Sequence, residues 1–412
     1  MHLVLPFAAL RPHPEYAAQV AAPPYDVVSS EEAREQARGK PWSFLHISKP
    51  EIDLPEGTDP YSPEVYAKAA ENMRRMLERG VLKREAAPCY YAYRLVMNGH
   101  AQTGLAAAAS VAEYEAQRVR RHELTRPEKE DDRVRQIEAL NAHTGPVMLA
   151  YPSAPEVDAI LADASSGAPE FDLTAGGGVR HMLWVIREED RIARLTAAFD
   201  AMPALYIADG HHRAAAASRV AASRRRGAPQ GSAEASCERF LCVAFPHDQM
   251  RILAYNRVVR DLNGLGREEF LRRVGAAFKL ERAGARVVPE RRGVFGLYLP
   301  GQWYRLEIEG ARIPEADPTA RLDVSLLARH LLGPVLAIGD PRTDPRIDFI
   351  GGIRGPEELE RRVAGGMAAA FSMYPTGMDE LMAVADSGAI MPPKSTWFEP
   401  KLADGLVSLA LD

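Results

Sequence analysis

Cysteine is scarce in this sequence: the 412 residues contain only Cys89, Cys237 and Cys242, and no two of them form a CxxC pair. The spacing therefore suggests neither a zinc ribbon nor a disulfide framework, and a reducing, cytoplasmic location is expected. The amino terminus carries no basic segment before its short apolar run, so no signal peptide is expected. The least charged long stretch, residues 95–112, is too polar to span a bilayer.

An excess of positive charge is missing as well. The chain has 51 basic and 56 acidic residues, which gives a net charge of -5 and argues against a protein that wraps nucleic acid. Two phosphate-loop patterns are also absent: residues 176–179 lack a GxGxxG spacing, and no Walker GxxxxGK[ST] segment occurs. With 46% hydrophobic and 26% charged residues, the composition is that of an ordinary globular protein.

The order of apolar and turn segments predicts a mixed α/β to α+β fold, since strands and helices alternate without a strict βαβ rhythm. We expect a larger part over residues 1–265 and a smaller α+β part over residues 266–412, whose last segment returns to the site. Residues 62–82 predict an amphipathic helix with Val65, Ala69, Met73, Met76 and Leu77 on its apolar face. Two strands are expected around the Asn98-Gly99 turn, and a surface loop within residues 223–240.

The segment from Met202 to Val220 contains an unusual succession: Asp209, Gly210, His211, His212 and Arg213. Residues 204–208 suit a short buried strand, the Asp-Gly pair a tight turn, and the alanines that follow a helix. A helix N-terminus offers free N–H groups and a positive dipole end, which together bind phosphate. Arg213 adds bidentate contacts and the histidines add donors, while Asp209 can hold Mg²⁺ or accept a hydroxyl proton.

The simpler interpretation of this segment is that Asp209 caps the helix and the histidines are incidental polar residues. Five such residues in succession favour the functional interpretation. A zinc site is not expected from this motif alone, because adjacent helical residues such as His211 and His212 point in different directions.

A second charged constellation lies at residues 121–133. Thr125 and Glu128 have the spacing of a capping box, and the following acids suit the start of a helix. Arg121, His122 and Glu123 come before that helix and supply the residue types that phosphoryl transfer needs, namely cations and a carboxylate base. A solvated helix start is the alternative for all of them.

Two proline-containing loops complete the candidates. Lys394 follows Pro392-Pro393, and a rigid loop that presents lysine and hydroxyls suits an anion; a plain connection into the last strand is the alternative. Tyr25 and Asp26 lie on the loop "APPYDVV" and are candidates for lining a substrate pocket, with an Asx-turn as the alternative.

Taken together, these motifs resemble a bacterial and archaeal family of unknown function. The resemblance rests on "APPYDVV", "RHELTRPEKEDDR", "ADGHHRAAAA", "YNRVVRDL", "IDFIGG" and the segment from Tyr374 to Leu406, which span nearly the whole chain. The "DGHHR" between a strand and a helix is also similar to the hallmark of the ParB/sulfiredoxin-like fold, a group that includes free serine kinases.

The resemblance implies a ParB/sulfiredoxin-like core with an additional C-terminal part, and a Mg²⁺-dependent phosphotransferase. ATP or ADP would donate a phosphoryl group to the hydroxyl of a small metabolite, with free L-serine the first acceptor to test. Asp209 would hold the metal and share the catalytic roles with Glu123. The residues expected at the nucleotide phosphates are Gly210, His211, His212, Arg213, Arg121, His122 and Lys394.

Two other functions stay open at this point. A ParB-like regulator would use the same loop to bind a nucleotide as a switch, and a phosphohydrolase or nuclease would use water as the acceptor. The expected partners are a nucleotide and a small molecule, without nucleic acid or membrane, and a homodimer remains open.

Overall fold

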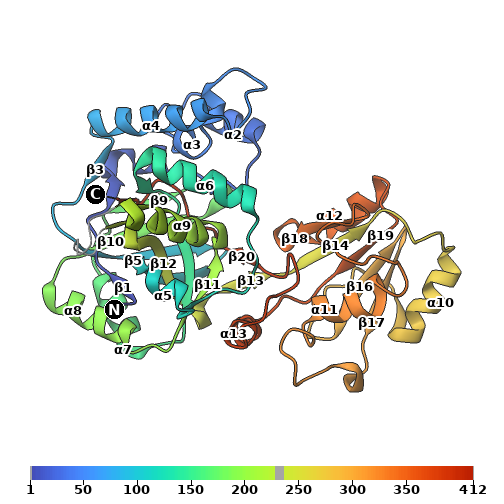
Figure 1. Cartoon of the computed structure of the whole chain (residues 1–412). Helices are drawn as coiled ribbons and strands as arrows, with labels where there is room; N and C mark the ends of the chain where they lie inside the picture. Colours follow the sequence, from blue (N-terminus) through green and yellow to red (C-terminus); the bar gives the residue numbers. More distant parts are fainter. Residues whose placement is uncertain (1, 228–235, 412) are drawn as a thin grey trace. The chain divides into compact units, whose positions relative to one another are not determined.

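The computed structural model describes residues 2–227 and 236–411, and the chain forms two compact units (Figure 1). Unit 1 comprises Met1–Met250 and Pro400–Asp412, and unit 2 comprises Arg251–Glu399. The fold is mixed α/β, as predicted. The units divide at residues 250 and 251, whereas the sequence predicted a boundary near residue 265. The reason is that β14 (Tyr255–Val259) pairs with β18 (Ile347–Gly351) and β19 (Ala369–Ser372) in the sheet of unit 2.

Unit 1 is built on a large mixed sheet. Among the described residues it has nine strands in the order β6-β11-β8-β12-β5-β4-β10-β9, with β1 paired to β5. The strands are β1 (Val4–Leu5), β4 (Tyr90–Met97), β5 (His100–Ser110), β6 (Val119–Arg120), β8 (Val147–Tyr151), β9 (Phe171–Thr174), β10 (Arg180–Ile186), β11 (Leu205–Asp209) and β12 (Arg239–Pro246). Only the β6/β11 and β8/β12 pairs are parallel. The expected hairpin is confirmed, since β4 and β5 pair around the Asn98-Gly99 turn.

Helices cover one face of this sheet and bury its main core. The core combines alternate strand side chains, such as Leu105 and Leu149, with side chains from four helices. These helices are α5 (Val111–Glu115), α7 (Pro155–Ala164), α8 (Glu189–Asp200) and α9 (His211–Gly227). Side chains of the opposite face, including Tyr93 and Val243, are buried too. Burial on both faces explains why the central strands β8 and β12 are apolar at nearly every position.

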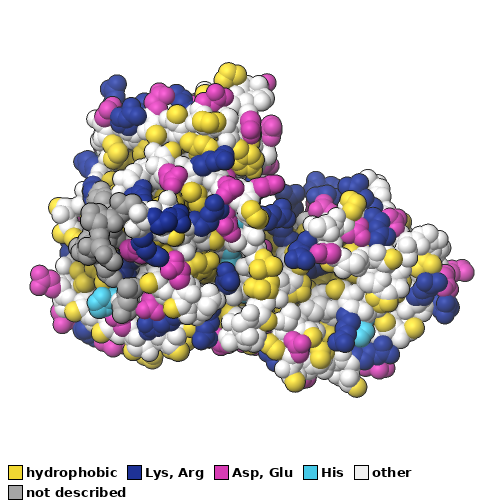
Figure 2. All heavy atoms as spheres, viewed as in Figure 1, with side chains coloured by type: hydrophobic (Ala, Val, Ile, Leu, Met, Phe, Trp, Pro, Cys, Tyr) yellow, Lys and Arg dark blue, Asp and Glu magenta, His cyan; other side chains and the backbone are white. Residues whose placement is uncertain are grey.

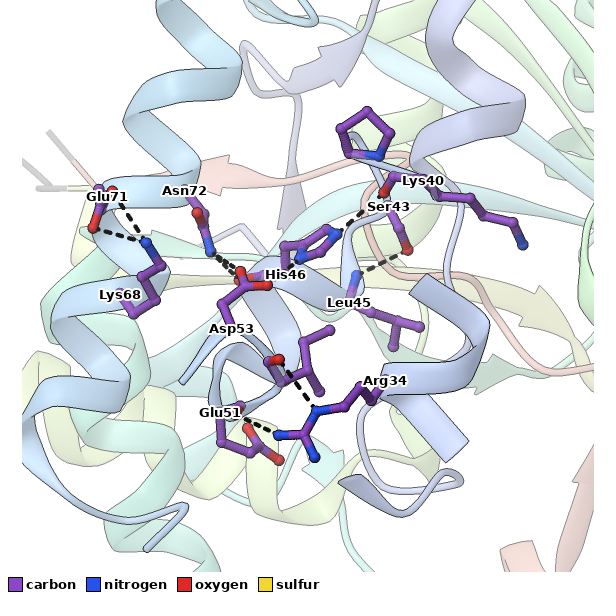
Figure 3. A network of polar contacts seen from close by, with 12 residues as sticks. Arg34, Lys40, Ser43, Leu45, His46, Glu51, Asp53, Lys68, Glu71 and Asn72 are labelled. Carbon is purple, nitrogen blue, oxygen red and sulfur yellow. Dashed lines mark hydrogen bonds and ion pairs between the residues drawn. The ribbon is translucent and has the colours of Figure 1, made fainter. Parts of the chain in front are cut away.

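A smaller core lies among the N-terminal helices α1 (Ala17–Val20), α2 (Ser30–Ala37), α3 (Leu45–Ser48) and α4 (Pro63–Glu78). A polar network links these helices and the following turn, and Figure 3 shows it from close by. In it, His46 and Asn72 both contact the Asp53 carboxylate at 2.8 Å. Helix α4 is packed by α6 (Pro127–Leu140), which lies beside α9 (Figure 1).

The last segment of the chain belongs to unit 1 and is pinned by backbone pairs. Asp404 pairs with Ala22 and Ser408 with Leu10, while β21 (Leu409–Ala410) pairs with β7 (Ala142–His143). These pairs fix residues 400–411 against the first 150 residues. A further pair joins β2 (Leu10–Pro12) to β3 (Leu82–Arg84).

Unit 2 contains an antiparallel sheet with the order β15-β17-β16-β19-β14-β18. Its other strands are β15 (Lys279–Ala283), β16 (Val294–Leu299) and β17 (Gln302–Glu307), and β13 (Arg251–Leu253) pairs separately with β20 (Trp397–Glu399). The helices are α10 (Arg267–Ala277), α11 (Asp323–Leu327), α12 (Gly355–Ala364) and α13 (Met378–Asp386). Its core gathers Val258, Trp303 and Leu359 around this sheet.

Two local expectations are wrong. Leu77 is 40% exposed, because α4 turns its face toward α3 and α6 through Met73 and Met76 instead. Thr125 does not cap a helix: α6 begins at Pro127 without a side-chain cap, and the Thr125 hydroxyl donates to the Glu130 carboxylate. The part of the expected surface loop at residues 228–235 lies outside the described residues.

The outer surface carries charges of both signs. On the face drawn in Figure 2, basic and acidic side chains are interspersed, as the small net charge requires. Within the described ranges, no helix is both long and apolar enough to traverse a bilayer.

Candidate functional site

The site begins where β11 ends. Ile207 pairs with Leu149 and Asp209 with Met148, so Ala208 is an extra residue that makes a β-bulge. A bulge changes the direction of the side chain that follows it. The Asp209 carboxylate here receives Lys401 Nζ at 3.0 Å on one oxygen, while its other oxygen lies 3.7 Å from Arg213 Nη2.

Gly210 makes the turn from the strand into α9. Its φ is +97°, a conformation that side chains rarely adopt, and the Arg213 guanidinium packs directly over its Cα. A Cβ on this residue would lie 3.0 Å from Arg213 Nε. The next three residues start the helix, with the Arg213 and Ala214 N–H groups already bonded back to the Gly210 carbonyl. Glycine at this position therefore allows a cation to lie across the helix N-terminus.

Arg213 is buried and only partly satisfied. Its Nη1 donates to the Pro146 carbonyl, but within the described part of the chain Nε and Nη2 have no hydrogen-bond acceptor. Two carboxylates, Asp26 and Asp209, lie 3.7 Å from Nη2, within ion-pair range but beyond hydrogen-bond distance. A buried guanidinium with two free donors can accept an additional anion.

Opposite charges shift the ionisation of this group of residues. Burial by itself would lower the pKa of Arg213, but the carboxylates of Asp26 and Asp209 raise it above its usual value. Burial would likewise raise the pKa of Asp209, but Lys401 and Arg213 hold it well below its ordinary range. Asp209 is thus an anion at every physiological pH.

Asp404 behaves in the opposite way. Burial raises the pKa of Asp404 to about 7, although Arg213 and Arg133 oppose the change. It lines a cavity of about 30 Å³ together with Tyr25, Arg133, His143 and Arg213. At roughly 10–15 Å³ per water, this volume holds two or three water molecules and excludes a nucleotide. The Asp26 and Glu123 side chains are more exposed, at 39% and 46%.

The loop with Tyr25 is fixed by stacking. The Arg133 guanidinium carbon lies 3.7 Å from the centre of the Tyr25 ring, and Arg133 also makes two hydrogen bonds to Asp132, at 2.7 and 2.9 Å. Burial raises the pKa of the Tyr25 phenol. The two residues predicted at a substrate pocket therefore lie beside Arg213: Tyr25 on the cavity wall, and Asp26 as its ion-pair neighbour.

His122, Glu123 and His211 come together from two segments. His211 Nδ1 lies 3.8 Å from the Glu123 carboxylate, and the His122 and His211 rings meet edge to face at 4.5 Å between centroids. The His122 backbone N–H donates to His211 Nε2 at 3.4 Å. Burial lowers the pKa of His122 to about 4 and that of His211 well below its usual value, so both rings are neutral.

The other histidine of the motif points elsewhere. His212 Nε2 accepts the Arg126 backbone N–H at 3.0 Å, which ties α9 to the loop before α6. Burial also lowers the pKa of His212. Arg121 is exposed. Burial raises the pKa of the Tyr114 phenol, and the positive charge of Arg121 opposes this change. Of the three residues predicted before the helix, the structure brings His122 and Glu123 to the motif.

Lys394 belongs to unit 2. Its backbone is left-handed with a φ of +58°, its ammonium lies 5.6 Å from the centre of the Tyr255 ring, and its carbonyl accepts a hydrogen bond from Arg257. Its predicted contact with the nucleotide remains a prediction.

Sequence reasoning did not single out Asp404, and it noted Lys401 only as part of the proline-containing loop of Lys394 without assigning it to this site. Both lie nearly 200 residues from the motif, in the segment "KLADGL". Lys401 follows a proline in a loop with an anion-binding composition, which was a signal for it, whereas an Asp-Gly turn such as that of Asp404 is too common to indicate a site.

The chain matches the family described as "Protein of unknown function (DUF1015)" over residues 4–325. It therefore belongs to that family, as the sequence motifs indicated. In the comparison with curated proteins, nothing matches.

Several solved structures are similar at low identity. A mutant of a free serine kinase in complex with ADP is 14% identical, with a TM-score of 0.37, and the match covers 74% of this chain and 91% of that one. SbnI with a C-terminal truncation, from Staphylococcus aureus, is 12% identical with a TM-score of 0.38, covering 74% and 88%. A conserved hypothetical protein from Pyrococcus furiosus is 12% identical with a TM-score of 0.34, covering 73% and 93%.

Proposed function

We propose that this protein is a phosphotransferase that moves the terminal phosphoryl group of ATP or ADP to the hydroxyl of a small metabolite. The observation that carries the proposal is Arg213, a buried guanidinium at the N-terminus of a 17-residue helix, two of whose nitrogens make no hydrogen bond within the described part of the chain. Helix N-terminus and guanidinium both favour a phosphate at this point.

The residues around Arg213 divide the remaining roles. One oxygen of Asp209 has no hydrogen bond from Arg213, which is 3.7 Å away, and so could hold Mg²⁺ together with nucleotide phosphates. When bound, Mg²⁺ would neutralise charge on the transferred group. Because its pKa is depressed, Asp209 is a poor proton acceptor and better suited to a cation.

Glu123 is the better candidate for the base. Its side chain is 46% exposed, so an acceptor hydroxyl can reach it from solvent. In the proposed step the acceptor oxygen forms a bond to phosphorus, the bond from phosphorus to the nucleotide oxygen breaks, and the hydroxyl proton passes to Glu123. The nucleotide leaves one phosphate shorter, with Lys401 and Arg213 positioned to offset its charge.

Free L-serine is the first acceptor, because the "DGHHR" segment resembles that of free serine kinases. The product would then be O-phosphoserine. Asp26 is proposed to face the amino group of the acceptor, since it lies beside Arg213 and is 39% exposed.

The test is phosphoryl transfer by the purified chain with Mg²⁺, ATP or ADP, and L-serine, with O-phosphoserine detected by mass spectrometry. Asp209→Asn is expected to lower the rate by about 100-fold or more, as loss of a charge-stabilising group does. Asp172→Asn is the matched control, since it removes a carboxylate paired with an arginine on an exposed strand.

Three outcomes would count against the proposal. Full activity of a folded Asp209→Asn protein would remove the role given to this residue. Absence of product, together with nucleotide-dependent thermal stabilisation, would favour a nucleotide-binding switch; phosphate release without an organic acceptor would indicate a hydrolase.

A further inference from the structure

The cluster of His122, Glu123 and His211 brings three metal-ligating side chains together from segments 88 residues apart. One donor atom from each lies within 4.8 Å of the other two. His122 and Glu123 come from the loop between β6 and α6, and His211 is the first residue of α9. The helix and the loop are held together by the contact of His212 with the Arg126 backbone, so the cluster has a fixed frame.

A second observation concerns His122 alone. The side chain is only 2% exposed, and neither ring nitrogen has a hydrogen-bond partner among residues 2–227 and 236–411. Buried polar groups in proteins are nearly always satisfied, so such a ring requires an explanation. A metal ion is a suitable partner, because it takes the lone pair of a neutral imidazole.

The kind of ligand selects the kind of metal. Two imidazoles and one carboxylate suit borderline cations such as Zn²⁺ or Co²⁺, whereas Mg²⁺ and Ca²⁺ prefer oxygen ligands throughout. Three protein ligands also leave a position for water or substrate, as in catalytic zinc sites. We propose that His122, Glu123 and His211 form a binding site for a divalent transition cation of the zinc class.

Closing the site requires small movements only. Donors around a tetrahedral zinc ion lie roughly 3.4 Å apart for bonds of about 2.0–2.1 Å. His211 Nδ1 and the Glu123 carboxylate oxygen are 3.8 Å apart, and the Glu123 side chain is half exposed. If His211 binds through Nδ1, its Nε2 carries the proton and loses the backbone N–H of His122, a contact already long at 3.4 Å.

This site goes beyond the proposed phosphotransferase and does not depend on it. Glu123 cannot accept a proton while it binds a metal ion. The metal content of the protein therefore distinguishes its proposed role as a base from its proposed role as a ligand. The test uses neither nucleotide nor acceptor, and its failure would leave the phosphotransferase proposal standing.

The experiment is equilibrium dialysis of the chelator-treated full chain against Zn²⁺ in a large excess of Mg²⁺, followed by metal analysis. Visible absorption after Co²⁺ addition reports the coordination of the ion. The wild-type chain is expected to retain about one Zn²⁺ per molecule and to show Co²⁺ bands of a four- or five-coordinate site. His122→Gln, His211→Gln and Glu123→Gln are each expected to weaken binding by at least about tenfold.

His2→Gln is the matched control: it removes an exposed histidine that contacts the Asp200 carboxylate and is expected to bind Zn²⁺ as the wild type does. Glu123→Gln keeps the proposal testable if a buried histidine variant fails to fold, because it alters only a half-exposed carboxylate. Absence of stoichiometric Zn²⁺ in the wild type would overturn the proposal, as would unchanged binding in folded Glu123→Gln.

Discussion

Two groups of residues in unit 1 each combine histidine with a carboxylate. They differ in how many of their polar atoms have hydrogen-bond partners. In the N-terminal group, His46 Nδ1 contacts Asp53 at 2.8 Å and His46 Nε2 contacts the Lys40 carbonyl at 3.1 Å. Asn72 bonds the second Asp53 oxygen, so both ring nitrogens of His46 and both carboxylate oxygens of Asp53 have a partner (Figure 3). Burial alone would raise the pKa of Asp53, but His46 and Asn72 hold it below its usual range.

The second group lies at the start of α9 and includes His122, His211 and Arg213. Some of its hydrogen-bond donors and acceptors have no partner among the described residues. Among the described residues, neither ring nitrogen of His122 and neither Nε nor Nη2 of Arg213 has a hydrogen-bond partner. A saturated network stabilises a fold, because each buried polar group recovers the hydrogen bonds it lost to water. An unsaturated one lowers stability and leaves positions for a ligand. The difference indicates that residue type alone does not mark a site; the unmet bonding capacity does.

The largest expected effect comes from removing the charge of Arg213, which tests how much this charge stabilises the group at the start of α9. Arg213→Met would remove the ion-pair neighbour of Asp26 and leave Asp209 with Lys401 as its counter-charge, and removing one partner of a buried ion pair costs about 3–5 kcal/mol. We expect a loss of this size in the free energy of unfolding, measured in urea. Arg180→Met, which removes an exposed partner of Asp172, is expected to change little. Equal losses in the two variants would contradict the comparison.

The next effect concerns the pH dependence of stability. The pKa of Asp404 in the folded protein is about 7, against about 3.9 for an ordinary aspartate. The folded protein therefore binds the extra proton between these values, and the stability that this proton contributes is lost as pH rises from about 4 to 7. At about 1.4 kcal/mol per pKa unit, the loss is on the order of 4 kcal/mol. Asp404→Asn should remove it.

Asp53 makes the stability of the protein depend on pH in the opposite direction. Its pKa is lowered by folding, so its contribution is present above the unfolded pKa and is lost as pH falls through the folded pKa. We therefore expect unfolding measured from pH 3 to about pH 8 to show a smaller loss of stability on the neutral side for Asp404→Asn than for the wild type. For Asp53→Asn the smaller loss of stability is expected on the acid side. A shared direction in both variants would contradict the assignment.

Replacement of the two histidines by an apolar ring is the most direct test of saturation. His46→Phe removes the donor to one Asp53 oxygen and one of the two donors to the Lys40 carbonyl, and is expected to cost about 1–3 kcal/mol. His122→Phe removes a ring without hydrogen-bond partners among the described residues, so its stability should change by less than about 1 kcal/mol in metal-free protein. Thermal unfolding of both variants, in the presence of a chelator, makes the measurement.

The smallest effect lies within the saturated group. Lys68 contacts Glu71 at 3.1 Å on the exposed side of α4, and such i,i+3 pairs contribute about 0.2–0.5 kcal/mol at most. Glu71→Gln is therefore expected to be nearly neutral in urea unfolding at low salt. A larger loss would mean that this exposed pair, and not the buried contacts of Asp53, carries the network.

Local features of the fold could be predicted from the sequence. The Asn98-Gly99 hairpin, the helix at Pro63–Glu78 and the strand–turn–helix around Asp209 follow from residues that are near neighbours. The Thr125 and Leu77 predictions failed for one reason: tertiary packing determined which hydroxyl bonded and which face was buried. Local preference is a weak constraint when packing favours another arrangement.

The sequence by itself determined the family, the mixed α/β class and the motif from Asp209 to Arg213, because each depends on short-range order along the chain. Tertiary structure alone decided that Lys401 meets Asp209 across 192 positions, and that His122 meets His211 across 89. Such pairs arise when strand order and loop closure bring distant segments together, and the spacing of residues in a sequence does not encode that distance.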